Sequence, residues 1–267
     1  MFTGLVLAGR RPASDALAGV WGAQHRALID VNGVPMLLRV VRAMRAAKRI
    51  GRLLVTIDEP AALEAVPELG RLVADGALTL HASLATPSRS VVDVLEGPAR
   101  GEPVLVATAD HVLLRSEMID HFAEASASES ADALVGLVAE TVVRSRFPDA
   151  TRTFLRLRGG GYKGANLFAF RTPEARRAAA FWVRAERFRK QPWRLVGALG
   201  PATLLLFALH RLDLDAAFDR ISRAAGARIR PIALPYPEAA IDVDRPADLA
   251  LASRALAERS DLETKIQ

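Results

Sequence analysis

Three arginines near the N-terminus have the chemistry to bind an anion. Arg10 and Arg11 directly follow the apolar run 2–8, and Arg26 precedes a second, short apolar run. Guanidinium groups present planar donors to phosphate oxygens, and backbone N–H groups after a strand also favour negative charge. We expect this loop to bind a polyphosphate. The stretch has neither a P-loop nor a GxGxxG pattern, so a solvated basic loop is the alternative.

Three aspartates are candidates for a divalent cation. Asp110 ends the apolar run 103–110, and Asp242 and Asp244 stand two apart in "AIDVDRPADLA". On an extended strand these last two share a face, and such a pair can complete a magnesium site with a distant third carboxylate. The alternatives are that Asp110 is a turn residue, that Asp244 caps the last helix and that Asp242 is solvated.

Alternating strands and helices would bring these residues together. Strand-like runs occupy 2–8, 52–58, 77–82, 103–110 and 132–140, and helical patterns occupy 35–49, 90–97 and 116–127. This alternation predicts a three-layer α/β/α sandwich with a mostly parallel, Rossmann-like central sheet. Ligands bind at the carboxyl ends of such strands, where the first loop and Asp110 both fall.

The pattern changes from about residue 144. Two strands joined by Gly159–Gly161 are expected first, then helices over 173–225, a strand at 227–235 and a closing helix up to 259. We predict a single domain over 1–259. Its nucleotide-binding half would be about 1–143 and its acceptor-binding part about 144–240, with a helical insertion at 173–225. Residues 260–267 are expected to be a polar, frayed tail.

The composition narrows the class of protein. The 267-residue chain is 51% hydrophobic and 25% charged, with a formal net charge of +6 and no cysteine. Disulfides, Cys-ligated zinc and thiol chemistry are therefore excluded. The basic residues are not interleaved with aromatic residues, which argues against nucleic-acid binding. The chain starts directly in a strand, with no signal-peptide pattern, and we expect a cytoplasmic protein.

One apolar stretch raises the question of a membrane. Residues 195–209 carry no charge, but they fall short of the roughly 20 residues that a span needs, and Gly200-Pro201 interrupts them. Two buried or interfacial helices are expected here. Basic residues flank the stretch, so peripheral membrane contact through 187–211 is the alternative to a core helix pair with a solvated rim.

Five segments together resemble the MobA-like NTP transferase family, nucleotidyltransferases with a glycosyltransferase-A-like fold. They are "LVLAG" (5–9), "HRALIDVNGVPMLLRVV" (25–41), "SVVDVL" (90–95), "VLVATADHVLL" (104–114) and "IDVDRPADLALA" (241–252). The family carries out Mg²⁺-dependent attack of a phosphorylated acceptor on the α-phosphate of an NTP, with release of pyrophosphate. The chain departs from the family pattern in its glycine-poor first loop, in Arg26 where lysine is usual, and in His111-Val112 after Asp110.

The resemblance implies a role for each matching residue. The backbone of the first strand end would hold the nucleotide, Ser90 would lie near the base, and the arginines would neutralise the pyrophosphate leaving group. Asp110 and Asp244 would hold Mg²⁺, with Asp242 as a helper. The residues implied for nucleotide and leaving group are Leu7, Ala8, Gly9, Arg10, Arg11, Arg26, Ser90 and Asp110.

The acceptor is expected to meet the segment after residue 150. Arg152, Arg156 and Arg158 alternate along one predicted strand, and Lys163 and Asn166 follow the glycines. These side chains suit an acceptor phosphate and hydroxyls, although an exposed basic edge strand that discourages aggregation has the same pattern.

The expected activity is therefore transfer of NMP from an NTP to a phosphorylated polyol, sugar or lipid precursor. Family breadth favours CTP, then GTP. A glycosyltransferase of the same fold and a non-catalytic nucleotide-binding protein at the membrane surface are the alternatives. The former typically has DxD after a mid-chain strand, whereas Asp110 stands alone and the DxD lies near the C-terminus.

Overall fold

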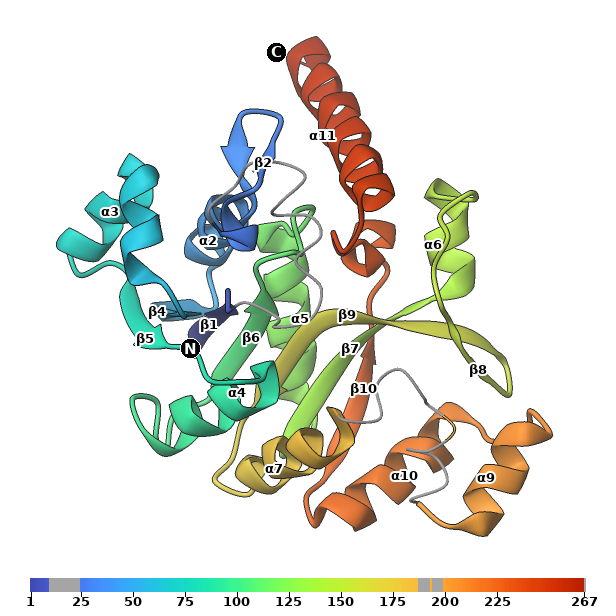
Figure 1. Ribbon diagram of the computed structural model, residues 1–267. Coiled ribbons are helices and arrows are strands. Elements are labelled where there is room, and N and C mark those ends of the chain that lie inside the picture. The colour runs from blue at the N-terminus through green and yellow to red at the C-terminus, as the bar shows by residue number, and fades with distance from the viewer. Residues whose placement is uncertain (10–24, 187–192, 194–198, 267) are drawn as a thin grey trace.

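A single mostly parallel β-sheet forms the centre of the computed structural model, which describes residues 1–9, 25–186, 193 and 199–266 (Figure 1). The strand order is β10-β7-β9-β6-β1-β4-β5, and β8 pairs with β9. A two-stranded hairpin of β2 (Asp30–Val31) and β3 (Val34–Pro35) lies apart from it. The strands of the main sheet are β1 (Phe2–Leu7), β4 (Ile50–Ile57), β5 (Thr79–Ala82), β6 (Val104–Thr108), β7 (Ala133–Ala139), β8 (Leu155–Leu157), β9 (Gly160–Phe170) and β10 (Ile229–Ala233).

The direction of the strands explains where the ligand edge lies. β1 runs parallel to β4 and β6, β4 to β5, and β7 to β10, whereas β9 is antiparallel to β6, β7 and β8. The carboxyl ends of β1, β4 and β6 therefore meet at one edge. The predicted mostly parallel sheet is confirmed, with the antiparallel strand β9 inserted in its middle.

Helices cover both faces of the sheet. One face packs against α2 (Met36–Ala46), α3 (Pro67–Ala74) and α5 (Ser116–Ser128), and the other against α4 (Pro87–Glu96), α7 (Ala175–Glu186) and α10 (Leu214–Ala225). The three expected layers are thus present. The remaining helices are α6 (Glu140–Arg146), α9 (Pro201–Ala208) and α11 (Pro246–Ile266), with the short 3-10 helices η1 (Arg26–Leu28), η2 (Pro60–Ala65) and η3 (Pro237–Ala240).

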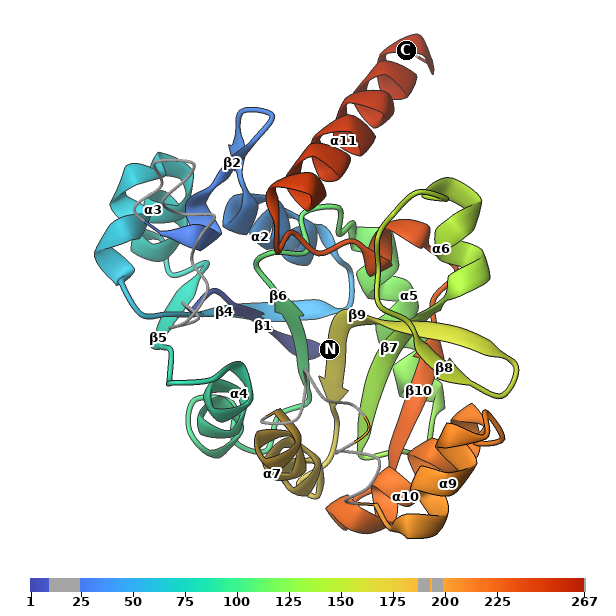
Figure 2. The ribbon, with the colours of Figure 1, turned by 45° about the vertical axis from the view of Figure 1, so that its right-hand side comes forward.

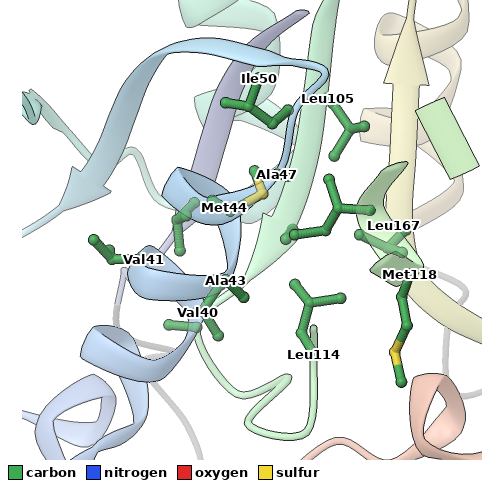
Figure 3. Packing of buried hydrophobic residues seen from close by; sticks show 14 of the residues in the cluster. Val40, Val41, Ala43, Met44, Ala47, Ile50, Leu105, Leu114, Met118 and Leu167 are labelled. Atoms are coloured by element: carbon green, nitrogen blue, oxygen red, sulfur yellow. The ribbon is translucent and has the colours of Figure 1, made fainter. Parts of the chain in front are cut away.

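The larger core cluster fixes the strand ends in place. In α2, Val40 and Met44 are one turn apart and point at the sheet, where Leu105 of β6 and Leu167 of β9 meet Met118 of α5 (Figure 3). All five are fully buried. Burying each such side chain contributes about 1.5–3 kcal/mol. The positions of β1 and β6, on which the site depends, are therefore set by packing rather than by the loops.

Two predicted features of the C-terminal half are wrong. No frayed tail starts at residue 260, because α11 continues to Ile266 and extends away from the body (Figure 2). Residues 246–266 contain no glycine, and proline only at the first position, so nothing ends the helix earlier. The Asp242–Asp244 segment is not a strand end, since residues 241–244 belong to neither sheet.

The apolar stretch before α10 also differs from a core helix pair. Only α9 falls within the described residues, and its apolar side chains are largely at the surface, with Leu205 61% exposed. Among the described helices, none is long and apolar enough to cross a membrane.

Candidate active site

A cleft lies at the carboxyl ends of β1, β4 and β6, at the edge that the strand directions select. Six residues predicted from the sequence meet there: Leu7, Ala8, Gly9, Arg26, Ser90 and Asp110. The rest of the lining is Ala27, Met36, Thr56, Ser83, Leu84, Pro87, Thr108 and Ala109. Residues from four separate segments thus share one cavity.

The end of β1 forms the floor of this cleft. The N–H of Ala8 donates to the carbonyl of Thr56 at 2.9 Å, so it is committed to the sheet. Gly9 comes next, and a Cβ added there would stand 2.6 Å from Oγ and 2.8 Å from Cβ of Ser83. Glycine is required here because the chain passes so close to the loop after β5. Within the described residues, Gly9 is therefore the candidate for a backbone contact to phosphate.

Ser90 shapes the wall of the cleft. It lies in the first turn of α4, where its Oγ accepts from the N–H of Leu84 at 2.8 Å. The serine is buried, whereas Leu84 is 43% exposed and lines the cleft. Ser90 thus holds the loop that presents Leu84, an apolar surface suited to the flat face of a base. Nothing in the sequence pattern singled out Leu84.

Arg26 stands between two of the predicted metal ligands. Its Nη2 donates to Oδ1 of Asp244 at 2.7 Å and to the carbonyl of Val243 at 2.7 Å, and it lies 3.6 Å from Oδ2 of Asp110. The side chains of Arg26 and Asp110 are about nine-tenths buried. Two carboxylates from distant parts of the sequence therefore converge on one cation of the cleft lining, although Asp244 itself is not among the lining residues.

A capping interaction holds Arg26 in place. Arg26 begins η1, and Nδ1 of the preceding His25 accepts from the N–H of Ala27 at 3.2 Å. The other ring nitrogen, Nε2, lies 2.9 Å from Oδ1 of Asp58, which follows β4. His25 is buried. It was part of the resembling segment but had no assigned role, and the structure shows that it anchors the turn that carries Arg26.

In the segment before α11, the side chains of Asp242 and Asp244 point to different partners. The N–H of Val243 donates to the carbonyl of Asp110 at 3.0 Å, which fastens this segment to the loop after β6. Asp244 then contacts Arg26, whereas Asp242 lies 3.2 Å from Nζ of Lys163. The expected shared strand face is wrong, because this hydrogen bond to the loop replaces strand pairing. Asp248, the third residue of α11, accepts from the N–H groups of Asp244 and Arg245 at 3.2 and 2.9 Å, which ties this segment to the first turn of the helix.

A second group of charges lies beside the first. Arg152 is buried, and its Nη1 reaches Asp242 at 3.3 Å and Asp248 at 3.0 Å. Lys163 of β9 shares Asp242 with it. Arg152 precedes β8. The expected alternation of Arg152, Arg156 and Arg158 along one strand is therefore wrong. Arg152 is a buried support for Asp242, and Lys163 is the more exposed cation of the group.

His111 is buried between these groups. Among the described residues, neither ring nitrogen has a partner at good hydrogen-bond geometry. Burial lowers the pKa of His111 to about 4, against the opposing effects of Asp242 and of the backbone of Glu238. The ring is therefore neutral near pH 7, and it adds no positive charge next to Asp110.

The remaining predicted acceptor residues are not drawn into the cleft. Arg156 is exposed on β8, where it pairs with Glu140, and Arg158 is exposed in the turn after it. Asn166 is half-buried within β9 and has a positive φ of 51°. Of the described residues lining the cleft, none comes from this hairpin. Arg10 and Arg11, predicted for the phosphates, lie outside the described residues.

The carboxylates suit a hard divalent cation. The described residues hold no cluster of three or more His, Cys, Asp or Glu side chains. Asp110 and Asp244 nevertheless converge on the guanidinium of Arg26, so this point in the cleft already accommodates positive charge. Mg²⁺ is commonly held by one or two carboxylates together with substrate phosphates. This pair fits that pattern.

Comparisons with known proteins identify the family and the fold. The model of the MobA-like NTP transferase domain matches residues 4–144. The structure of a hypothetical transferase from Thermus thermophilus is 28% identical, with a TM-score of 0.75, and the match covers 93% of this chain and 100% of that chain. No curated protein matches the chain.

Two more distant structures share the fold alone. One is CMP:2-keto-3-deoxy-manno-octonic acid synthetase complexed with CTP, at 14% identity and a TM-score of 0.59, with 96% of this chain and 99% of that chain covered. The other is 4-diphosphocytidyl-2C-methyl-D-erythritol synthase from Anaerococcus prevotii, at 12% identity and a TM-score of 0.55, with 96% of each chain covered.

Proposed function

The chain belongs to the MobA-like NTP transferase family, a family of nucleotidyltransferases, and we propose that it transfers NMP from an NTP to a phosphorylated small molecule. In this reaction an oxygen of the acceptor phosphate attacks the α-phosphorus. The bond between that phosphorus and the bridging oxygen to the β-phosphate breaks, and its electron pair leaves with pyrophosphate. The nucleophile is already an anion, so no general base is needed.

One observation carries the proposal above all. Asp110 and Asp244 come from distant parts of the chain and meet at Arg26 inside the cleft at the ends of β1 and β6. Phosphoryl transfer requires little covalent chemistry from the protein, so positioning and charge stabilisation dominate. A site that gathers cation and anion positions around a cavity suits that requirement.

Each residue of the cleft has a distinct task in this proposal. The base would lie against Leu84, and Gly9 would donate its backbone N–H to a phosphate. Asp110 and Asp244 would hold Mg²⁺, with Asp242 as a more distant helper. When bound, Mg²⁺ would supply the positive charge that lets two anionic phosphates approach each other.

Arg26 would neutralise the charge that develops on pyrophosphate, together with Arg10 and Arg11 of the first loop. Its guanidinium is held by Asp244 and by the carbonyl of Val243, so it is positioned before substrate arrives. A preorganised cation needs little reorganisation at the moment of reaction, which makes it effective in the transition state. Arginine in place of lysine also offers paired donors to phosphate.

The acceptor would bind on the Lys163 side of the cleft. Lys163 is partly exposed next to Asp242, and Asp242 borders the segment that delivers Asp244. Its ammonium suits an acceptor phosphate, and Asn166, Arg156 and Arg158 of the same hairpin would extend the contact to more distant groups. The acceptor is proposed to be a polyol, sugar or lipid-precursor phosphate.

The test is a pyrophosphate-release screen of the four NTPs against phosphorylated alcohols and sugars. CTP is tried first, since two of the distant neighbours have cytidine nucleotides in their names, and GTP next. We expect release that needs one NTP, one class of acceptor phosphate and Mg²⁺. Release with a dephosphorylated acceptor, or nucleotide binding without release across the panel, would contradict the proposal, and the latter would favour the non-catalytic alternative.

A further inference from the structure

The surface around α9 is apolar where a soluble helix would be polar. Its sequence, "PATLLLFA", has no charged residue, and the next residue, Leu209, is apolar as well. Leu206 and Phe207 pack on the small cluster of Leu157 and Leu212. On the outside, Leu204, Leu205 and Leu209 are 36%, 61% and 56% exposed. These three leucines, which we call the α9 surface, account for nearly half of the exposed large hydrophobic residues of the described chain.

Positive charge borders this surface. Arg211 follows the helix and is exposed, and the N–H of Arg158 donates to the carbonyl of Leu212 at 2.9 Å, which places the turn after β8 beside it. Among the described residues, neither Arg158 nor Arg211 forms a side-chain ion pair or hydrogen bond. Asp213, the nearest carboxylate in the sequence, is committed to capping α10, where it accepts from the N–H of Ala216 at 2.7 Å.

We propose that the α9 surface docks on an anionic lipid membrane. An eight-residue helix is about 12 Å long and cannot span a bilayer, but it can lie in the interface with its leucines among the acyl chains. Arg158 and Arg211 would meet the anionic headgroups. The net charge of +6 adds long-range attraction to the same surface.

The occupant is inferred to be lipid because of this combination of contacts. A protein partner would favour a surface that includes hydrogen-bond donors and acceptors, whereas the exposed face of α9 is apolar, with Pro201, Ala202 and Ala208 beside the leucines. The exposed residues that border it, His210 and Arg211 after the helix and Arg158 in the turn after β8, are basic. The helix packs on the β8–β9 hairpin, and Lys163 lies on that same hairpin three residues beyond Gly160. The docking itself does not depend on the proposed transferase activity.

The experiment is vesicle co-sedimentation with the full chain. Phosphatidylcholine vesicles are compared with vesicles containing about one-third phosphatidylglycerol, at low and high salt. We expect binding to the anionic vesicles at low salt and release at high salt, because the Debye length falls to about 3 Å at 1 M. No binding to anionic vesicles at low salt would overturn the proposal.

Two double variants and one single variant separate the contributions of the leucines and of the arginines to vesicle binding. Leu205→Ser with Leu209→Ser keeps the net charge and should weaken partitioning at least about 10-fold, since each leucine loses its burial in the acyl region. Arg158→Gln with Arg211→Gln should weaken it by about 10- to 30-fold at low salt, at roughly fivefold for each charge. Arg254→Gln is the control, because Arg254 is exposed on α11 and should bind as the wild type does. The helix α11 extends from the side of the molecule opposite α9 in both views (Figures 1 and 2).

Two outcomes would assign the contact to something other than the α9 surface on lipid. If the serine variant sediments as the wild type does, the attraction is general charge and the α9 surface is not the contact. If the wild type self-associates without lipid and the serine variant is monomeric, the leucines form a protein interface instead. Either result overturns the proposal, and circular dichroism of the exposed-site variants confirms that they are folded.

Discussion

Replacing Arg26 by alanine is the most informative change in the site, because Arg26 has contacts of two kinds. Its Nη2 donates to Asp244 and to the carbonyl of Val243, both at 2.7 Å, and faces Asp110 at 3.6 Å. The pair with Asp244 is discounted, since that carboxylate is 41% exposed. The contact to Asp110 is nearly buried, so its contribution is counted in full. We therefore expect Arg26→Ala to lower the free energy of unfolding by about 2–4 kcal/mol.

The same substitution should affect nucleotide and metal in opposite directions. A charge-assisted contact to phosphate contributes about 1.5–3 kcal/mol, so NTP affinity or kcat/KM should fall roughly 10- to 100-fold. Most of the preference for NTP over NMP should vanish with it. In the absence of nucleotide, Mg²⁺ should bind Arg26→Ala about 10-fold more tightly, because Asp110 and Asp244 lose their competing cation.

Calorimetric titration of NTP, NMP and Mg²⁺ measures all three quantities, with urea unfolding as the check on the fold. Arg26→Lys is the matched control and should retain most activity, since lysine is the residue that the family pattern has there. If Arg26→Ala bound NTP and NMP as the wild type does, Arg26 would not contact the phosphates. If its Mg²⁺ affinity were unchanged, the two carboxylates would not be the cation site.

Three further substitutions test other parts of the site. The folded protein keeps His111 neutral down to a pKa of about 4, whereas the unfolded chain binds a proton at His111 below about pH 6.5, so the free energy of unfolding falls as the pH drops from about 6.5 to about 4. Urea unfolding in EDTA should show that the wild type loses about 2 kcal/mol of this free energy between pH 7 and pH 5. The His111→Phe variant should not show this loss. Gly9→Ala should weaken NTP binding at least about 10-fold, because its Cβ would meet Ser83, and adding Ser83→Gly should restore binding, as fluorescence titration can show. Lys163→Ala should raise the KM for the acceptor about 10-fold and leave the KM for NTP unchanged. An equal rise in both KM values would contradict a contact of Lys163 with the acceptor alone.

The sequence identified the elements whose patterns are local and strongly periodic. β1, β4, β6, α2 and α5 lie where the apolar runs indicate, because each buries residues that also favour its own secondary structure. The position of β9 was not accessible in this way. Its insertion between β6 and β7 depends on pairing between distant segments, which no local pattern records.

The site shows the same division. Gly9 and Asp110 reach the cleft because each follows a strand whose place in the sheet could be predicted, and Ser90 reaches it because it lies in the first turn of a helix that the pattern also predicts. The contact between Arg26 and Asp244, 218 positions apart, could not be derived from spacing. The segment of Asp242 and Asp244 was predicted as a strand on the basis of alternation alone. A single hydrogen bond from Val243 to Asp110 decides its conformation instead.

The most direct test of the central claim is the rate of pyrophosphate release by Asp110→Asn over a range of Mg²⁺ concentrations. Loss of one carboxylate from the cation should lower turnover at least about 100-fold, and Asp244→Asn should do the same, with circular dichroism as the check that both variants are folded. Asp75→Asn, at an exposed helix end, is the matched control and should be fully active. Normal Mg²⁺-dependent release by Asp110→Asn would contradict the assignment of this cleft as a metal-assisted nucleotidyl transfer site.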